Sequence, residues 1–120
     1  MRRKSTTKTR QRKKSTSRIS KARLEAMVEE AIVDCCNESE QVTGLSTMIE
    51  EHLAVPFETT ILGAPVTVER VDVNHRDQIV AICARGPERQ AIPILDLPLP
   101  SPRPAGAEWI EAYRHWLGEG

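Results

Sequence analysis

The side chains best suited to chemistry in this 120-residue chain carry oxygen, and they gather between residues 34 and 40. Asp34, Asn37, Glu38 and Glu40 fall where one predicted helix gives way to the next. A hard cation such as Ca²⁺ takes six to eight oxygen ligands from carboxylates, amides, carbonyls and water. The segment therefore predicts a divalent-cation site. The competing interpretation is a solvated helix end with capping acids, and composition alone favours it.

A second oxygen-rich stretch runs from Asp72 to Asp77 and begins with the D-x-N spacing of an EF-hand loop. The pattern then fails, because Arg76 stands at the fifth position and Asp77 stands where glycine is required. Cys83 occupies the position of the bidentate glutamate. We predict a polar turn that lends one ligand at most.

Sets of residues that would indicate catalysis are missing from the sequence. It contains no glycine-rich phosphate loop and no GxSxG, HExxH or CxxC motif. Its three histidines are predicted to be surface residues, and Cys35-Cys36 is more typical of packing than of a nucleophile. We therefore predict that the protein is not an enzyme.

Two helices are predicted in the N-terminal half. Ser20 suits the N-cap of the first, whose apolar residues follow at spacings of three and four: Leu24, Met27, Val28, Ala31 and Cys35. Asn37-x-x-Glu40 is a capping-box pattern that begins the second. Its apolar face is formed by Val42, Leu45, Met48, Ile49 and Leu53. We expect Gly44 to lie where this helix approaches a neighbouring element, and Pro56 to lie beyond its end.

Short strands are predicted next, at residues 57–62, 66–73, 78–85 and 90–95. The turns between them are predicted at 63–65, 74–77 and 86–88, and such short connections indicate an antiparallel meander. The alternation of the second strand slips near Glu69, as a β-bulge would make it do. Pro93 places the last strand at an edge of the sheet.

A closing helix is predicted at residues 107–117, after a proline-rich connector. Trp109, Tyr113 and Trp116 fall on one face of it and should anchor the core. The predicted fold class is α+β: two N-terminal helices, a four-stranded antiparallel meander and a C-terminal helix, in one domain over residues 20–118.

Charge divides the chain sharply. Residues 1–24 hold eleven Lys or Arg and no acid, whereas residues 25–120 hold all seventeen acids and only six Lys or Arg. Residues 1–19 have almost no apolar side chain, and we predict a disordered basic tail. An alternative function follows: an interaction module whose tail binds nucleic acid or another polyanion. A solubilising tail, a tail folded back on the acidic body and an organelle transit peptide remain open.

The number and spacing of the cysteines indicate the cellular compartment of the protein. They are three in number and two are adjacent, which is unlike a disulfide framework and fits a reducing environment. No run of 18 apolar residues exists, and no apolar segment of the secretory kind follows the basic N-terminus. We expect a cytoplasmic protein without a membrane partner.

The stretch from Ile32 to Gly44 and its continuation resemble the bacterial calcium-binding proteins of the CcbP type. That family shows V-D-A-Y-x-x-E-E-Q-x-x-G-W, then Y-L-E-x-x-L, then F-P-F. The matching residues here are Val33-Asp34, Glu40-Gln41, Gly44, Glu50, Leu53 and Pro56-Phe57. The Gly63 turn, the strand around Cys83, the strand near Ile92 and the closing helix also look alike, so the resemblance covers about residues 20–118.

The resemblance implies an α+β fold that binds calcium through an acidic surface patch, as a buffer or sensor, without known catalysis. The resemblance does not by itself assign the ligands; the residues that we expect to bind the ion are Asp34, Glu38 and Glu40, with Glu50 and Glu51 as nearby candidates. The chain departs from the family pattern at the aromatic positions, which are Cys36 and Leu45 here, and at Ser39, where another acid is common. Fewer carboxylates predict weaker binding. The basic tail is not part of the pattern.

Overall fold

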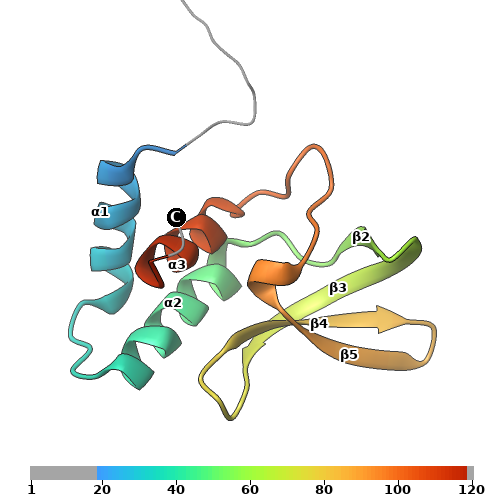
Figure 1. Ribbon diagram of the computed structural model, residues 1–120, viewed down its shortest axis with the longest axis horizontal. Helices are drawn as coiled ribbons and strands as arrows, with labels where there is room; N and C mark the ends of the chain where they lie inside the picture. Colours follow the sequence, from blue (N-terminus) through green and yellow to red (C-terminus); the bar gives the residue numbers. More distant parts are fainter. Residues whose placement is uncertain (1–18, 119–120) are drawn as a thin grey trace, which may run out of the picture.

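A computed structural model describes residues 19–118 of the chain and confirms the α+β prediction. Two helices come first, then an antiparallel meander, then a closing helix (Figure 1). The elements are α1 (Lys21–Ile32), α2 (Glu38–His52), β2 (Phe57–Ile61), β3 (Ala64–Val73), β4 (Ile79–Arg85), β5 (Glu88–Pro93), the 3₁₀ helix η2 (Ile94–Asp96) and α3 (Glu108–Trp116). The predicted disorder of residues 1–19 falls almost entirely outside the described residues.

Both helix starts follow the local signals in the sequence. The Ser20 hydroxyl accepts a hydrogen bond from the Arg23 N–H at 3.1 Å, which caps α1. The Asn37 side chain accepts one from the Glu40 N–H at 2.9 Å, which caps α2. α1 ends at Ile32, so Cys35 lies beyond the helix rather than on its apolar stripe.

The sheet has the order β2-β3-β4-β5, with every neighbouring pair antiparallel. The predicted bulge is confirmed, because the register of β3 against β4 shifts between Val68 and Arg70. Pro93 is on the edge strand β5, also as predicted.

The turn between β2 and β3 differs from the prediction. It consists of Leu62 and Gly63, with φ of 51° and 80°, whereas Ala64 and Pro65 already belong to β3. A two-residue turn with positive φ at both positions matches the twist of the paired strands. Leucine rarely adopts this conformation, so the sequence pointed to a turn that begins one residue later.

The three helices gather at one end of the sheet, and the β2–β3 and β4–β5 turns reach away from them (Figure 1). The helices and the covered part of the sheet enclose the core, where the largest fully buried side chains are Leu45, Ile49, Val68, Ile79, Ile94 and Ile110. Gly44 lies against the backbone of Ala31, which confirms the predicted close approach of α2 to α1. Burial of these apolar side chains is the main source of stability.

The closing helix anchors the core with Trp109 and Tyr113, as predicted. Trp116 is only partly buried, and its indole N–H donates to the Gln41 side chain at 3.1 Å. Trp109 also stacks on His52 at the end of α2, with ring centroids 5.4 Å apart. α3 therefore packs against the helix that carries most of the candidate ligands.

No helix within residues 19–118 has both the length and the apolar character needed to cross a bilayer.

Candidate metal site

Two of the oxygen-bearing residues at the start of α2, Asn37 and Glu40, are engaged in hydrogen bonds at the helix end. The Glu40 carboxylate accepts a hydrogen bond from the Cys36 N–H at 2.6 Å, while Asn37 caps the Glu40 N–H. Glu38 and Glu40 lie in the first turn, where the positive end of the helix dipole stabilises acids and disfavours cations. This corner therefore shows the features of the competing interpretation, a helix end with capping acids.

Asp34 lies in the loop between α1 and α2, exposed and with φ of 66°. Among residues 19–118 no group of three or more His, Cys, Asp or Glu is placed to hold a metal ion. The set of Asp34, Glu38 and Glu40 is therefore not a three-carboxylate centre. Calcium binding itself stays a prediction.

The second oxygen-rich stretch is a polar turn, and the structure brings it beside the first. The Ser39 hydroxyl donates to the Asp77 carboxylate at 3.3 Å, so the start of α2 touches the β3–β4 turn. The Asn74 side-chain oxygen accepts from the N–H groups of Arg76 and Gln78, at 2.8 and 3.0 Å. It is thus used within the turn.

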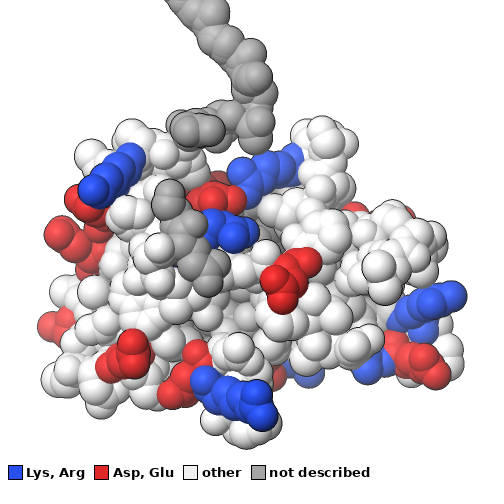
Figure 2. Space-filling model, viewed as in Figure 1, with Lys and Arg blue, Asp and Glu red and all other residues white. Residues whose placement is uncertain are grey.

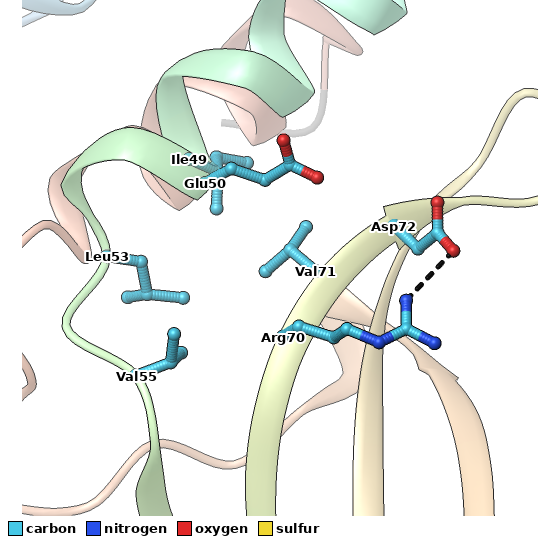
Figure 3. Close-up of a pocket in the computed structure, with 7 residues that line it drawn as sticks. All are labelled: Ile49, Glu50, Leu53, Val55, Arg70, Val71 and Asp72. Carbon is cyan, nitrogen blue, oxygen red and sulfur yellow. Dashed lines mark hydrogen bonds and ion pairs between the residues drawn. The ribbon is translucent and has the colours of Figure 1, made fainter.

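A hollow lies between the end of α2 and the edge of β3, and two other acidic residues are among those that line it (Figure 3). Its volume is about 320 Å³, and it is lined by Ile49, Glu50, Leu53, Val55, Arg70, Val71 and Asp72. Glu50 extends from α2 above Ile49 and Val71, whereas Asp72 extends from β3 away from Glu50, on the same side as Arg70 (Figure 3). Glu50 was a predicted candidate, whereas Asp72 had been assigned only to the polar stretch.

Local interactions keep Asp72 ionised. Its carboxylate accepts a hydrogen bond from the Val73 N–H at 2.8 Å and pairs with the Arg70 guanidinium at 3.1 Å. The Val73 hydrogen bond, followed by the Arg70 interactions, holds the pKa of Asp72 below its ordinary value of 3.8. Both side chains of the ion pair are more than half exposed, so the pair is weak.

The end of α2 favours a cation more than its start does. Glu50 and Glu51 lie in the last turn, where the helix dipole is negative. Within the described part of the chain, Glu50 makes no hydrogen bond or ion pair. Its carboxylate is therefore available to a ligand in the hollow.

The backbone of β3 also presents polar atoms to this hollow. Asn74 and Gln78 form a hydrogen-bonded pair at the end of the β3–β4 ladder, since the Asn74 N–H donates to the Gln78 carbonyl at 2.9 Å. Hydrogen-bonded pairs alternate with open ones along an antiparallel ladder. Val73 and Val71 are therefore in open pairs, and their N–H and C=O groups point away from β4.

Nothing in residues 19–118 covers that edge as a strand. β2 pairs with β3 only as far as Val68, so the edge from Arg70 onward has no strand beside it. The Val73 N–H is taken by Asp72, and on the opposite edge the Ile79 N–H donates to the Tyr113 hydroxyl at 3.4 Å. Val71 itself is buried, so this part of the edge is covered although no strand pairs with it.

The surface of the described part is mainly acidic. Residues 19–118 contain sixteen Asp or Glu and eight Lys or Arg. Acidic side chains gather over α1 and along the lower edge of the face in Figure 2. Four of the arginines pair with carboxylates, in Arg70–Asp72, Arg89–Glu69, Arg103–Glu111 and Arg114–Glu111.

No protein-family model, no curated protein and no solved structure matches this chain.

Proposed function

We propose that this protein binds Ca²⁺ weakly in the hollow between α2 and β3, as a calcium buffer or sensor of the bacterial cytoplasm. The observation that carries the proposal is the Glu50 carboxylate, which lies at the hollow in the last turn of α2 and makes no hydrogen bond or ion pair within residues 19–118. The negative end of α2 adds to the attraction for a cation. The motif resemblance to calcium-binding proteins of the CcbP type supports the choice of ion.

The ligand supply sets the expected affinity. The Glu50 carboxylate can bind through both oxygens, whereas both oxygens of Asp72 are engaged by the Val73 N–H and Arg70, so most of the remaining positions fall to water. Sites with few charged ligands bind calcium weakly, and we expect a dissociation constant on the order of 10⁻⁴ to 10⁻³ M. Such a site would be occupied only when the free calcium concentration rises far above its resting value.

Calorimetric titration of calcium into the full chain tests the proposal. Replacing Glu50 by Gln removes one charge about 4 Å from a divalent ion, which is worth about 2 kcal/mol in a solvated site, or roughly a thirtyfold loss of affinity. The matched control is Glu29→Gln, an exposed glutamate of α1. Its affinity should stay within about twofold of the original, since exposed charges at a distance are screened.

Two results would contradict calcium binding in the hollow. If 10 mM calcium, about ten times the weakest expected dissociation constant, gives neither heat nor a shift of the melting curve, the protein is not a calcium binder in this range. If Asp34→Asn and Glu38→Gln abolish binding while Glu50→Gln does not, the ion lies at the α1–α2 corner instead.

A second candidate function is polyanion binding by the basic N-terminal segment. Residues 1–18 hold nine Lys or Arg and no acid, whereas the described part carries an excess of acids. Binding through this segment should be independent of base sequence and should weaken steeply with salt. Deletion of residues 1–19 should abolish it and leave calcium binding intact, because the Ser20 cap and every core residue remain.

A further inference from the structure

The outer edge of β5 carries main-chain hydrogen-bonding groups that the rest of the described chain leaves unused. β5 is the last strand of the sheet and forms one rim of it (Figure 1). Its first four residues, Glu88 to Ala91, are all exposed. The chain then leaves the edge at Ile94, whose side chain is buried in the core, so the residues that follow do not extend along β5.

The β4–β5 hairpin determines which groups point outward. Arg85 and Glu88 flank the two-residue turn Gly86-Pro87 and therefore form a hydrogen-bonded pair. Hydrogen-bonded and open pairs alternate along an antiparallel ladder, so Arg89 and Ala91 direct their N–H and C=O groups away from β4. Within residues 19–118 none of these four outward groups makes a hydrogen bond.

The opposite edge of the sheet is better covered. The Thr59 hydroxyl donates to the Pro98 carbonyl at 2.6 Å, which holds the connector after η2 beside β2. Proteins commonly cover an edge strand in this way, because a bare edge pairs readily with another strand. β5 has no such cover in the described part of the chain, so it is the edge at which an added strand can pair.

A second copy of β5 fits this edge in one antiparallel register. When Gln90 lies on a two-fold axis, Arg89 of each copy faces Ala91 of the other, and the two pairs exchange four main-chain hydrogen bonds. No proline has to donate a hydrogen bond in this register, because Pro87 and Pro93 face each other beyond the four bonds.

The neighbouring registers are less favourable. With Ala91 on the axis, Pro93 would face Arg89 and would have no N–H to donate. With Arg89 on the axis, two like charges would stand directly opposite each other, which is destabilising in a sheet. Pro87 would also face Ala91 without an N–H. The two prolines and the arginine therefore select the register centred on Gln90.

The side chains are compatible with that register. The two Gln90 amides would face each other across the axis, and an amide can both donate and accept, so identical residues can pair. On the same face, Ile92 of one copy would lie opposite Glu88 of the other. Arg89 extends from the other face, where Glu69 holds its guanidinium with two hydrogen bonds of 3.0 and 3.1 Å and balances its charge near the axis.

We propose that two copies of this chain associate through β5, with Gln90 on the two-fold axis, and join their sheets into one continuous antiparallel sheet. The helices of both copies then lie on the same side of it. The contact joins two edges rather than two faces, so the interface is small and we expect a dissociation constant on the order of 10⁻⁴ M. The association depends neither on calcium nor on the basic N-terminal segment.

Sedimentation equilibrium of the full chain, from about 10 μM to about 1 mM, measures the association. Ala91→Pro removes two of the four intermolecular hydrogen bonds and spares the β4 ladder, because Ala91 is in an open pair. Its dissociation constant should rise by about thirtyfold. The matched control is Thr60→Pro, the same kind of change at an exposed open-pair position of β2, and it should stay within about twofold of the original.

Two further measurements test the edge and the register. Amide exchange at Ala91 of the original chain needs no variant, and it should slow as the protein concentration rises through the dissociation constant. Gln90→Glu would place two carboxylates about 5 Å apart on the axis, and it should weaken the dimer by about fourfold at neutral pH.

Three results would overturn the proposal. The first is a chain that remains monomeric up to about 1 mM, with exchange at Ala91 independent of concentration. The second is equal weakening by Ala91→Pro and Thr60→Pro, since association would then not involve β5 in particular. The third is a dimer that Gln90→Glu leaves unchanged, which would exclude the register centred on Gln90.

Discussion

Replacing Gly44 by alanine tests how tightly α2 is held against α1. A Cβ atom at this position would overlap the carbonyl oxygen of Ala31 and lie 3.3 Å from its carbonyl carbon. It would also lie 3.4 Å from the Cys35 sulfur. The obstacle is backbone, which cannot rotate away as a side chain can. The helices must therefore move apart to admit the methyl group.

The size of the effect follows from two opposing terms. Alanine is favoured over glycine in a helix interior by about 1 kcal/mol. Forcing a methyl group into a closed contact costs about 1–3 kcal/mol, and the backbone obstacle places this site at the upper end. The net loss of about 2 kcal/mol should lower the melting temperature of a 100-residue domain by roughly 8–16 °C.

Thermal unfolding followed by circular dichroism measures this shift. The control is Thr47→Ala, one turn later on the exposed face of α2, which should move the melting temperature by about 2 °C or less. A Gly44→Ala protein that melts at or above the original temperature would refute the reasoning. The gain in helix propensity would then exceed the cost of the steric overlap, and α1 and α2 would move apart at little cost in free energy.

Three further outcomes follow from the structure. Glu40→Ala removes a helix-start acid and its bond to the Cys36 N–H, and should lower the free energy of unfolding in urea by about 1 kcal/mol. Thr59→Val leaves the Pro98 carbonyl without the 2.6 Å bond from the buried Thr59 hydroxyl, and should cost about 1–2 kcal/mol in the same assay, whereas Thr59→Ser should cost less. Burial raises the pKa of the Cys83 thiol above its ordinary value of 9.0, so a disulfide reagent should label exposed Cys36 quickly and Cys83 only on unfolding. Because the unfolded thiol ionises first, the stability that Cys83 provides should fall as pH rises past about 9.

The parts of the fold that depend on local signals could be predicted from the sequence. Ser20 and Asn37 cap the two helices as expected, because capping involves residues three positions apart. The bulge near Glu69 was visible as a slip in alternation. The β2–β3 turn was misplaced, because the positive φ of Leu62 is imposed by strand pairing rather than by its residue type.

The candidate site could be predicted only in part. Glu50 was among the candidate ligands, but its position at the hollow depends on how α2 packs against β3, for which no sequence spacing gives a signal. The acids at the start of α2 posed a different difficulty. Glu40 is of the right type both for a cap and for a ligand, and only its hydrogen bond to the Cys36 N–H distinguishes the two roles.

The contact between α1 and α3 joins the first and last helices of the fold. During synthesis α1 and the sheet leave the ribosome with one wall of their core missing, since Trp109, Ile110 and Tyr113 arrive last. The apolar faces of α1 and α2 therefore stay partly exposed until the residues of α3 have been synthesised. Ribosome-bound chains that stop short of α3 would be natural clients for a chaperone.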